Sequence, residues 1–215
     1  MSSYFSALWD WLVEAYHSMA ELVIVNMLWF GLTILVVTAP PAAAGLYYAT
    51  NQMAHEKAIG WRTFFEGFRE HFWMSWRWAL ANLLVASLIV VNYLFYQGFE
   101  SAWSTWVQGL FVGLFILWVL LNLYTFPLLL EQEDRRLIIA LRNSLVIYIR
   151  RPLYAFGTAV LIGILIYGSS RFLFVLWPVI TAGLGAYLSS RVTVRVVAEL
   201  TGAGSAQEQD AGESP

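Results

Sequence analysis

The sequence predicts an all-α fold: a polytopic membrane helical bundle of five transmembrane helices with amphipathic interfacial helices. Three observations predict it. Hydrophobic residues make up 60% of the chain and charged residues only 12%, whereas soluble domains carry about 25% charged residues. Apolar stretches recur that are long enough to cross the hydrocarbon core, which takes about 20 helical residues. Basic residues are almost confined to alternate connections between these stretches.

Each predicted span is a predominantly apolar stretch within a single integral membrane domain over residues 1–200. The spans are residues 20–39, 78–97, 106–129, 152–168 and 172–190. Pro40 and Pro41 are expected to end the first helix, with a bent helical continuation behind them, and Pro178 to kink the fifth. Residues 1–20 contain no Lys or Arg. A signal peptide begins with a basic region, so the first span is expected to stay uncleaved.

The basic residues predict the orientation. In the five-span topology eleven of the twelve Lys and Arg residues fall on one side, and only Arg171 falls on the other. The eleven are Lys57, Arg62, Arg69, Arg77, Arg135, Arg136, Arg142, Arg150, Arg151, Arg191 and Arg195. By the positive-inside rule this side is cytoplasmic. The prediction is a multi-pass protein of the cell (plasma) membrane with its N-terminus outside and its C-terminus in the cytoplasm.

Both long cytoplasmic connections show helical periodicity. Aromatic residues recur at helical spacing over residues 61–76, and aliphatic residues do so over residues 136–149. We expect amphipathic helices at the interface. A shift of 73 positions aligns Arg69 with Arg142; a true duplication and convergence of two membrane elbows explain this equally well. Residues 201–215 are rich in Gly, Ser, Gln and acidic residues, which predicts a disordered C-terminal tail.

Several short segments together resemble one known family. They are Asn26-Met27-Leu28-Trp29, Ala39-Pro40-Pro41-Ala42-Ala43-Ala44-Gly45-Leu46-Tyr47-Tyr48, Trp61-Arg62-Thr63-Phe64-Phe65-Glu66-Gly67-Phe68-Arg69 with Phe72, and Ala140-Leu141-Arg142-Asn143-Ser144-Leu145 with Pro152. Over about residues 1–200 the chain resembles the YesL-like family of bacterial integral membrane proteins (domain of unknown function 624). The doubled proline departs from the single proline expected there. The genes of this family often lie beside ABC-type carbohydrate uptake and polysaccharide-degradation genes, which implies an accessory role near sugar transport.

No residue pattern predicts catalysis, a cofactor or a metal site. The chain has no cysteine, which excludes disulfides, thiolate nucleophiles and Cys-ligated metals. Asp10, Glu14, His17 and Glu21 share one helical stripe whose oxygen and nitrogen atoms suit a divalent cation. The favoured interpretation is the solvated face of an interfacial helix. His55 and His71 lack the spacing of a zinc-binding helix.

Polar residues within the predicted spans and two matched arginines are the remaining candidates. The intramembrane polar residues are Asn26, Asn82, Asn92 and Asn122. Hydrogen bonds between helices are favoured for them over a polar substrate path. Arg69 and Arg142 are candidate contacts for a partner or an anionic lipid, and snorkelling to the headgroups explains them equally well.

Two pairs of small residues have helix-packing spacing. Gly109 with Gly113 and Thr181 with Gly185 lie four residues apart, a spacing that allows two helices to approach closely. An internal contact is favoured over a homodimer contact, and homo-oligomerisation is left open.

We therefore expect an integral membrane protein that is not an enzyme and uses no cofactor. The leading function is an accessory component that binds a partner, such as an ABC permease for carbohydrate, within the lipid bilayer. The alternative is a small permease for a neutral solute such as a sugar, with Asn82 and Asn122 lining the path. No charged residue lies at the centre of a predicted span, which weakens ion-coupled transport. The net charge of −2 gives no field that would attract nucleic acid.

Overall fold

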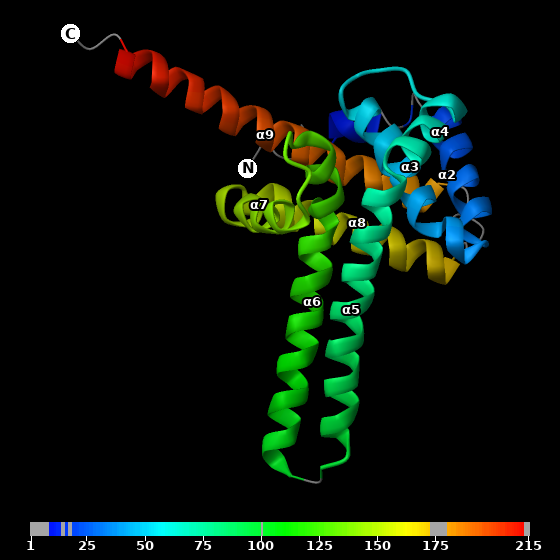
Figure 1. The fold of residues 1–215 in the computed structure, drawn as a ribbon, viewed down its shortest axis with the longest axis vertical. Helices are drawn as coiled ribbons and strands as arrows, with labels where there is room; N and C mark the ends of the chain where they lie inside the picture. Colours follow the sequence, from blue (N-terminus) through cyan, green and yellow to red (C-terminus); the bar gives the residue numbers. More distant parts are fainter. Residues whose placement is uncertain (1–8, 14–15, 17–18, 100, 173–179, 213–215) are drawn as a thin grey trace.

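The computed structural model shows an all-α protein and describes residues 9–13, 16, 19–99, 101–172 and 180–212, with side chains to Gly202 (Figure 1). No β-strand occurs among these residues. The elements are α2 (Met19–Thr33), the 3-10 helix η1 (Val36–Thr38), α3 (Ala39–Ala54), α4 (Trp61–Glu70), α5 (Phe72–Gln97), α6 (Ala102–Glu131), α7 (Leu137–Arg150), α8 (Pro152–Phe172) and α9 (Ala182–Gly212).

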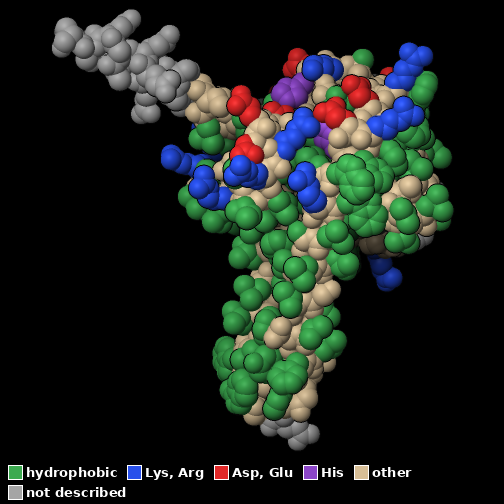
Figure 2. All heavy atoms as spheres, viewed as in Figure 1, with side chains coloured by type: hydrophobic (Ala, Val, Ile, Leu, Met, Phe, Trp, Pro, Cys, Tyr) green, Lys and Arg blue, Asp and Glu red, His purple; other side chains and the backbone are tan. Residues whose placement is uncertain are grey.

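Among the described residues, three helices are long and apolar enough to cross a membrane, which points to a membrane protein. They are α5, α6 and α8. In Figure 1, α5 and α6 form a long hairpin that extends away from the other helices, while α8 runs across the direction of the hairpin. Figure 2 shows hydrophobic side chains along the hairpin and charged side chains gathered on the part of the protein above it.

Helix α3 is the central element of the packed region above the hairpin. It contacts α2, α4, α5, α6 and α9, and its buried residues include Ala42, Ala44, Gly45 and Ala49. Small residues let helix backbones approach closely. The approach to α4 is the tightest that the glycines reveal: a Cβ atom on Gly67 of α4 would collide with Tyr48 of α3, and one on Gly45 would lie 2.7 Å from the carbonyl oxygen of Phe64.

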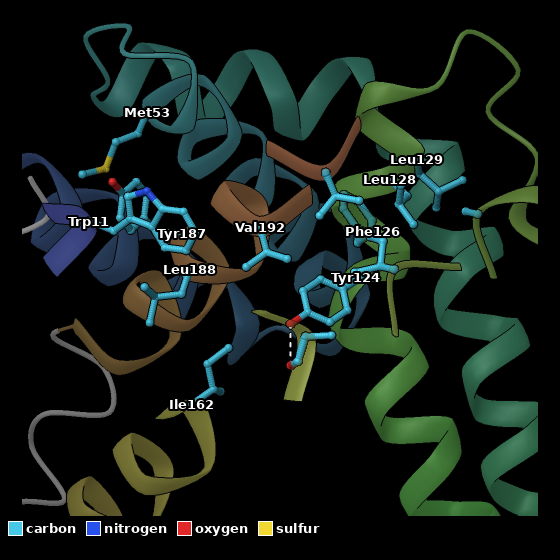
Figure 3. Packing of buried hydrophobic residues seen from close by; sticks show 14 of the residues in the cluster. Trp11, Met53, Tyr124, Phe126, Leu128, Leu129, Ile162, Tyr187, Leu188 and Val192 are labelled. Atoms are coloured by element: carbon cyan, nitrogen blue, oxygen red, sulfur yellow. Dashed lines mark hydrogen bonds between the residues drawn. The ribbon is translucent and has the colours of Figure 1, made fainter. Parts of the chain in front are cut away.

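A continuous hydrophobic core joins α3 to α6, α8 and α9 (Figure 3). Tyr124 and Phe126 of α6 and Tyr187 of α9 are fully buried. The hydroxyl of Tyr124 donates a hydrogen bond to the backbone oxygen of Ala155 at 2.9 Å. This bond gives the buried phenol a partner and ties α6 to the first turn of α8.

The first apolar run differs from the predicted span over 20–39. Helix α2 ends at Thr33 after 15 residues, and the two prolines lie in the first turn of α3 instead of ending the preceding helix. Proline lacks a backbone N–H but is well tolerated in a first helical turn. The hydroxyl of Thr38 donates hydrogen bonds to the backbone oxygens of Leu32 and Leu35, which satisfies carbonyls freed by the break. The predicted helix behind the prolines is confirmed.

The other elements agree with the sequence to different degrees. Helix α7 confirms the helix predicted over 136–149, whereas its place at the membrane interface stays a prediction. The helix predicted over 61–76 ends at Glu70, and α5 begins two residues later. Within the predicted fifth span, residues 173–179, which include Pro178, lie outside the described residues. The rest of this span from Ala182 onward forms the first part of α9. Helix α9 continues to Gly212 through most of the predicted disordered tail, where Ala, Gln and Glu favour helix.

The two pairs of small residues have different surroundings. A Cβ atom on Gly109 or Gly113 would meet nothing within 4 Å, so the predicted internal contact is wrong there. In the second pair, a Cβ on Gly185 would lie 3.6 Å from Ile162, and one on neighbouring Gly183 would lie 3.1 Å from Asn26 Oδ1. The internal contact is confirmed at α9.

Replacing Gly45 by alanine should lower the free energy of unfolding by roughly 1–3 kcal/mol, because the added methyl group forces the α3–α4 contact apart. Gly31→Ala in α2 is the control, since nothing lies within 4 Å of its Cβ position. Thermal unfolding in detergent, followed by tryptophan fluorescence, should show a lower Tm for the first variant only. Equal Tm values for both variants would contradict the close packing of α3 on α4.

Candidate functional site

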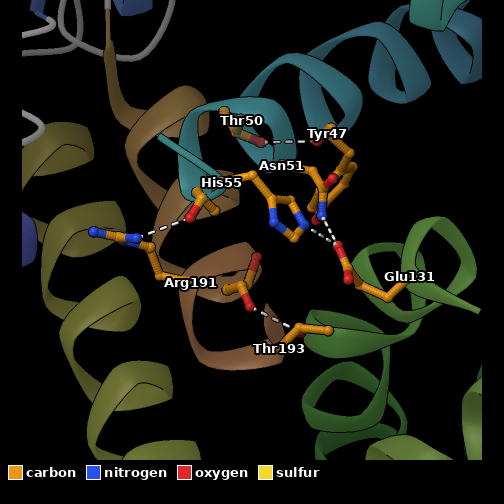
Figure 4. Close-up of polar contacts among 9 residues, drawn as sticks. Tyr47, Thr50, Asn51, His55, Glu131, Arg191 and Thr193 are labelled. Atoms are coloured by element: carbon orange, nitrogen blue, oxygen red, sulfur yellow. Dashed lines mark hydrogen bonds and ion pairs between the residues drawn. The ribbon is translucent and has the colours of Figure 1, made fainter. Parts of the chain in front are cut away.

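A polar cluster joins the C-terminal ends of α3 and α6 (Figure 4). The carboxylate oxygen Oε1 of Glu131 accepts a hydrogen bond from the Asn51 amide at 2.7 Å. The same atom lies 2.8 Å from His55 Nε2. Asn51 and Glu131 are largely shielded from solvent, whereas His55 is 38% exposed. We call Asn51, His55 and Glu131 the Glu131 cluster.

Arg191 attaches α9 to the same end of α3. Its guanidinium donates a 2.8 Å hydrogen bond to the backbone oxygen of Ala54, the last residue of α3. The same group lies 3.9 Å from the carboxylate of Glu56. A cation at a helix C-terminus satisfies a free carbonyl and interacts favourably with the helix dipole. Three helix segments distant in sequence therefore meet through polar contacts at one place.

The geometry of the Glu131 cluster suits a structural clasp. One carboxylate oxygen takes two hydrogen bonds, from Asn51 of α3 and from His55 directly after it, and charge-assisted bonds of this kind are stronger than neutral ones. The described residues contain no group of three or more His, Asp or Glu side chains that could hold a metal ion. The imidazole and carboxylate together could exchange a proton, but catalysis also needs a positioned reacting group.

From the sequence, His55 was weighed only as a zinc ligand, and Asn51 and Glu131 were not singled out. A usable signal was present, because Asn51 and His55 are four residues apart and share one helix face. Glu131 is also the first acidic residue after the long apolar run that begins at Ala102. Their meeting depends on the crossing of α3 and α6, which spacing along the chain does not encode.

His71 lies at the joint between α4 and α5. Its side chain is 1% exposed, its ring nitrogens have no hydrogen-bond partner, and its ring makes an edge contact with Tyr48 at 5.3 Å. Burial is the main cause that lowers the pKa of His71; the carboxylate of Glu70, 3.8 Å away, opposes this effect. The neutral ring is therefore favoured in the folded protein.

Asn82 and Asn122 form a reciprocal pair of contacts inside the α5–α6 hairpin. The indole N–H of Trp78 donates to Asn122 Oδ1 at 3.1 Å, and that of Trp118 donates to Asn82 Oδ1 at 3.0 Å. Each asparagine amide also donates to the backbone oxygen four residues earlier in its own helix. Both asparagines thus serve contacts between α5 and α6.

The other two predicted intramembrane asparagines have different surroundings. Asn26 is fully buried, and its Oδ1 accepts a 2.5 Å hydrogen bond from the backbone N–H of Gly183, which joins α2 to α9. The Asn92 amide donates to the backbone oxygen of Leu88 at an exposed position within α5. Asn26 therefore contributes to helix packing, whereas the hydrogen bond described for Asn92 stays within its own helix.

The candidate arginines are exposed on separate helices. Arg69 of α4 lines a shallow hollow with Trp61, Arg62 and Phe65, and Arg142 lies on the outer face of α7. Neither forms an ion pair with another described residue. The structure therefore leaves both side chains accessible and does not bring them together.

The acidic stripe near the N-terminus is only partly described. Asp10 and Glu21 are exposed, whereas Glu14 and His17 lie outside the described residues. The predicted solvated face over these four positions therefore stays a prediction.

An apolar cavity of about 310 Å³ lies between α3 and the helices around it. Trp29, Tyr47 and Trp78 contribute aromatic walls, and Thr181 contributes a hydroxyl. None of the described residues that line it carries a charged side chain. A cavity of this kind suits a small, largely apolar ligand.

Replacing Glu131 by alanine should lower the free energy of unfolding by roughly 1–3 kcal/mol, because Asn51 loses its side-chain acceptor in a shielded place. Glu133→Ala is the matched control, since Glu133 is exposed and has no ion pair among the described residues. Chemical unfolding in detergent micelles measures the difference. An equal loss of unfolding free energy in both variants would show that the removal of any negative charge here, and not the loss of the Glu131 cluster, lowers the stability.

Comparison with known proteins adds one finding to this geometry. Neither the curated proteins nor the solved structures give a match to the chain. Residues 22–93 match the model of a family described as "Protein of unknown function, DUF624". The matched region runs from α2 to near the end of α5, so it includes the close α3–α4 contact, Asn51 and His55. The region from α2 to α5 is therefore similar to this family.

Proposed function

We propose that the protein is a non-enzymatic accessory component of the membrane that binds another membrane protein. The observation that carries this proposal is the α5–α6 hairpin, which extends beyond the packed helices with its apolar surface uncovered (Figures 1 and 2). The most apolar part of α5 has no buried residue. Lipid covers this surface by default, and a partner helix can replace lipid at small cost where packing is good.

The hairpin surface contains a groove that would receive such a helix. Val90 and Tyr93 of α5 and Phe111, Val112 and Phe115 of α6 line a hollow of about 190 Å³ with no polar wall. Gly109 and Gly113 lie near it in sequence, and open space surrounds both. Aromatic ridges beside small residues provide the shape complementarity on which association in lipid depends.

The identity of the partner rests on family resemblance. We infer a bacterial YesL-like protein of the plasma membrane whose partner is an ABC permease for carbohydrate. We further propose the five-span topology, with the N-terminus outside and the C-terminus in the cytoplasm. The segregation of eleven of twelve basic residues supports that topology; the hairpin provides two of the five spans.

The permease alternative has less support. It places Asn82 and Asn122 along a solute path, whereas their side-chain oxygens accept hydrogen bonds from Trp118 and Trp78 inside the hairpin. A polar solute would have to displace these bonds or pass elsewhere.

Val112→Trp should abolish partner association, because the indole fills the groove between α5 and α6. Val160→Trp in α8 is the control, since both valines are about half exposed and lie on apolar helices. A photo-crosslinking amino acid at each position in intact membranes, followed by mass spectrometry, should give a permease adduct at 112 and none at 160. Equal adducts at both positions, or only lipid adducts, would contradict the proposal.

A further inference from the structure

A second hollow lies where the hairpin joins the packed helices, and its chemistry differs from that of the groove. It has a volume of about 440 Å³ and lies between the first turns of α5, the end of α6 and the beginning of α7. Arg77, Arg135 and Arg136 line it together with apolar side chains that include Trp78 and Ile138. Three cations beside an apolar wall suit a ligand with an anionic group attached to a hydrocarbon chain.

The charges around the hollow leave an excess of positive charge. Arg135 lies 3.3 Å from the carboxylate of Glu70, and both side chains are almost half exposed. Arg136 lies 3.1 Å from the carboxylate of Asp134 and is also exposed. Arg77 forms no ion pair with a described residue. Exposed ion pairs of this kind contribute little stability. An anionic ligand can therefore bind Arg135 and Arg136 beside the two carboxylates or in their place.

The position of the hollow identifies the ligand. Helices α5 and α6 are both long and apolar enough to cross a membrane, and the hollow lies at one end of both, at the level expected for lipid headgroups. A single guanidinium group can donate two parallel hydrogen bonds to two oxygens of one phosphate. Below the hollow, exposed apolar residues such as Leu80 and Leu84 continue along α5 toward its other end, where acyl chains would lie.

We propose that Arg77, Arg135 and Arg136 form a binding site for the headgroup of an anionic phospholipid, whose acyl chains lie along the hairpin. The site is distinct from the partner groove, which lies further along the hairpin. It is also distinct from Arg69 and Arg142, the arginines that their matched sequence positions suggested.

Native mass spectrometry of the full chain in detergent, titrated with phosphatidylglycerol, tests the site. The Arg77→Gln/Arg136→Gln double variant should weaken the apparent Kd by about fivefold for each arginine removed. Arg142→Gln is the control for the removal of a single charge, because it removes one positive charge from an exposed position on α7 and should leave the Kd unchanged. Ile138→Glu is a second variant: Ile138 is 81% exposed, so folding tolerates a carboxylate there, while lipid binding should weaken.

Three outcomes would overturn the proposal. Equal weakening by Arg142→Gln would show general attraction between a basic surface and lipid. Equal binding of phosphatidylcholine would show that net headgroup charge is not recognised. Complete competition by millimolar inorganic phosphate would show a phosphate site that does not use the lipid chains. Circular dichroism of each variant in the same detergent shows whether its fold is retained.

Discussion

The hydrocarbon core of a membrane offers no hydrogen-bond partner, and this constraint underlies the whole structure. A helix satisfies the hydrogen bonds of its backbone internally, but the polar side chains of each span still need hydrogen-bond partners. In the hairpin each helix provides the partner for the other: the indole of Trp78 in α5 donates to Asn122 in α6, and the indole of Trp118 in α6 donates to Asn82 in α5. Because these four polar side chains bind one another within the hairpin, and the Asn92 amide binds the backbone of its own helix, the outer surface of the hairpin is largely apolar. That surface can extend into lipid without support from other helices.

The polar and charged groups beyond the hairpin then explain how it is held. The Glu131 cluster ties the end of α6 to the end of α3, and α3 is the helix against which most of the packed elements lie. Small residues make α3 suitable for this role, since Gly45 brings its backbone close to α4. The basic residues around this end of the hairpin form the proposed binding site for the anionic lipid headgroup. One end of the hairpin is thus fixed by polar contacts, and the other projects freely.

Periodicity predicted the elements whose pattern is local. Helix α7 follows from aliphatic spacing, and the hairpin helices follow from uninterrupted apolar runs. The first span was predicted too long because hydropathy stays high past Thr33, whereas the hydroxyl of Thr38 and the prolines behind it favour a break. The Glu131 cluster and the hollow lined by Arg77, Arg135 and Arg136 could not be predicted, because each combines residues from helices whose crossing depends on close packing. Asn82 and Asn122 were identified correctly as polar positions within predicted spans, but their tryptophan partners were not.

The central claim is that the hairpin crosses the membrane twice, with the basic end of α6 opposite the turn between α5 and α6. Cysteine accessibility tests this most directly, since the chain has no native cysteine. Single cysteines at Gly98, beside the turn, and at Glu133, after α6, are both exposed. A membrane-impermeant maleimide added to intact cells should label Gly98→Cys and leave Glu133→Cys unlabelled until the membrane is opened. Labelling of both cysteines in intact cells would contradict the account, and so would protection of both until the membrane is opened.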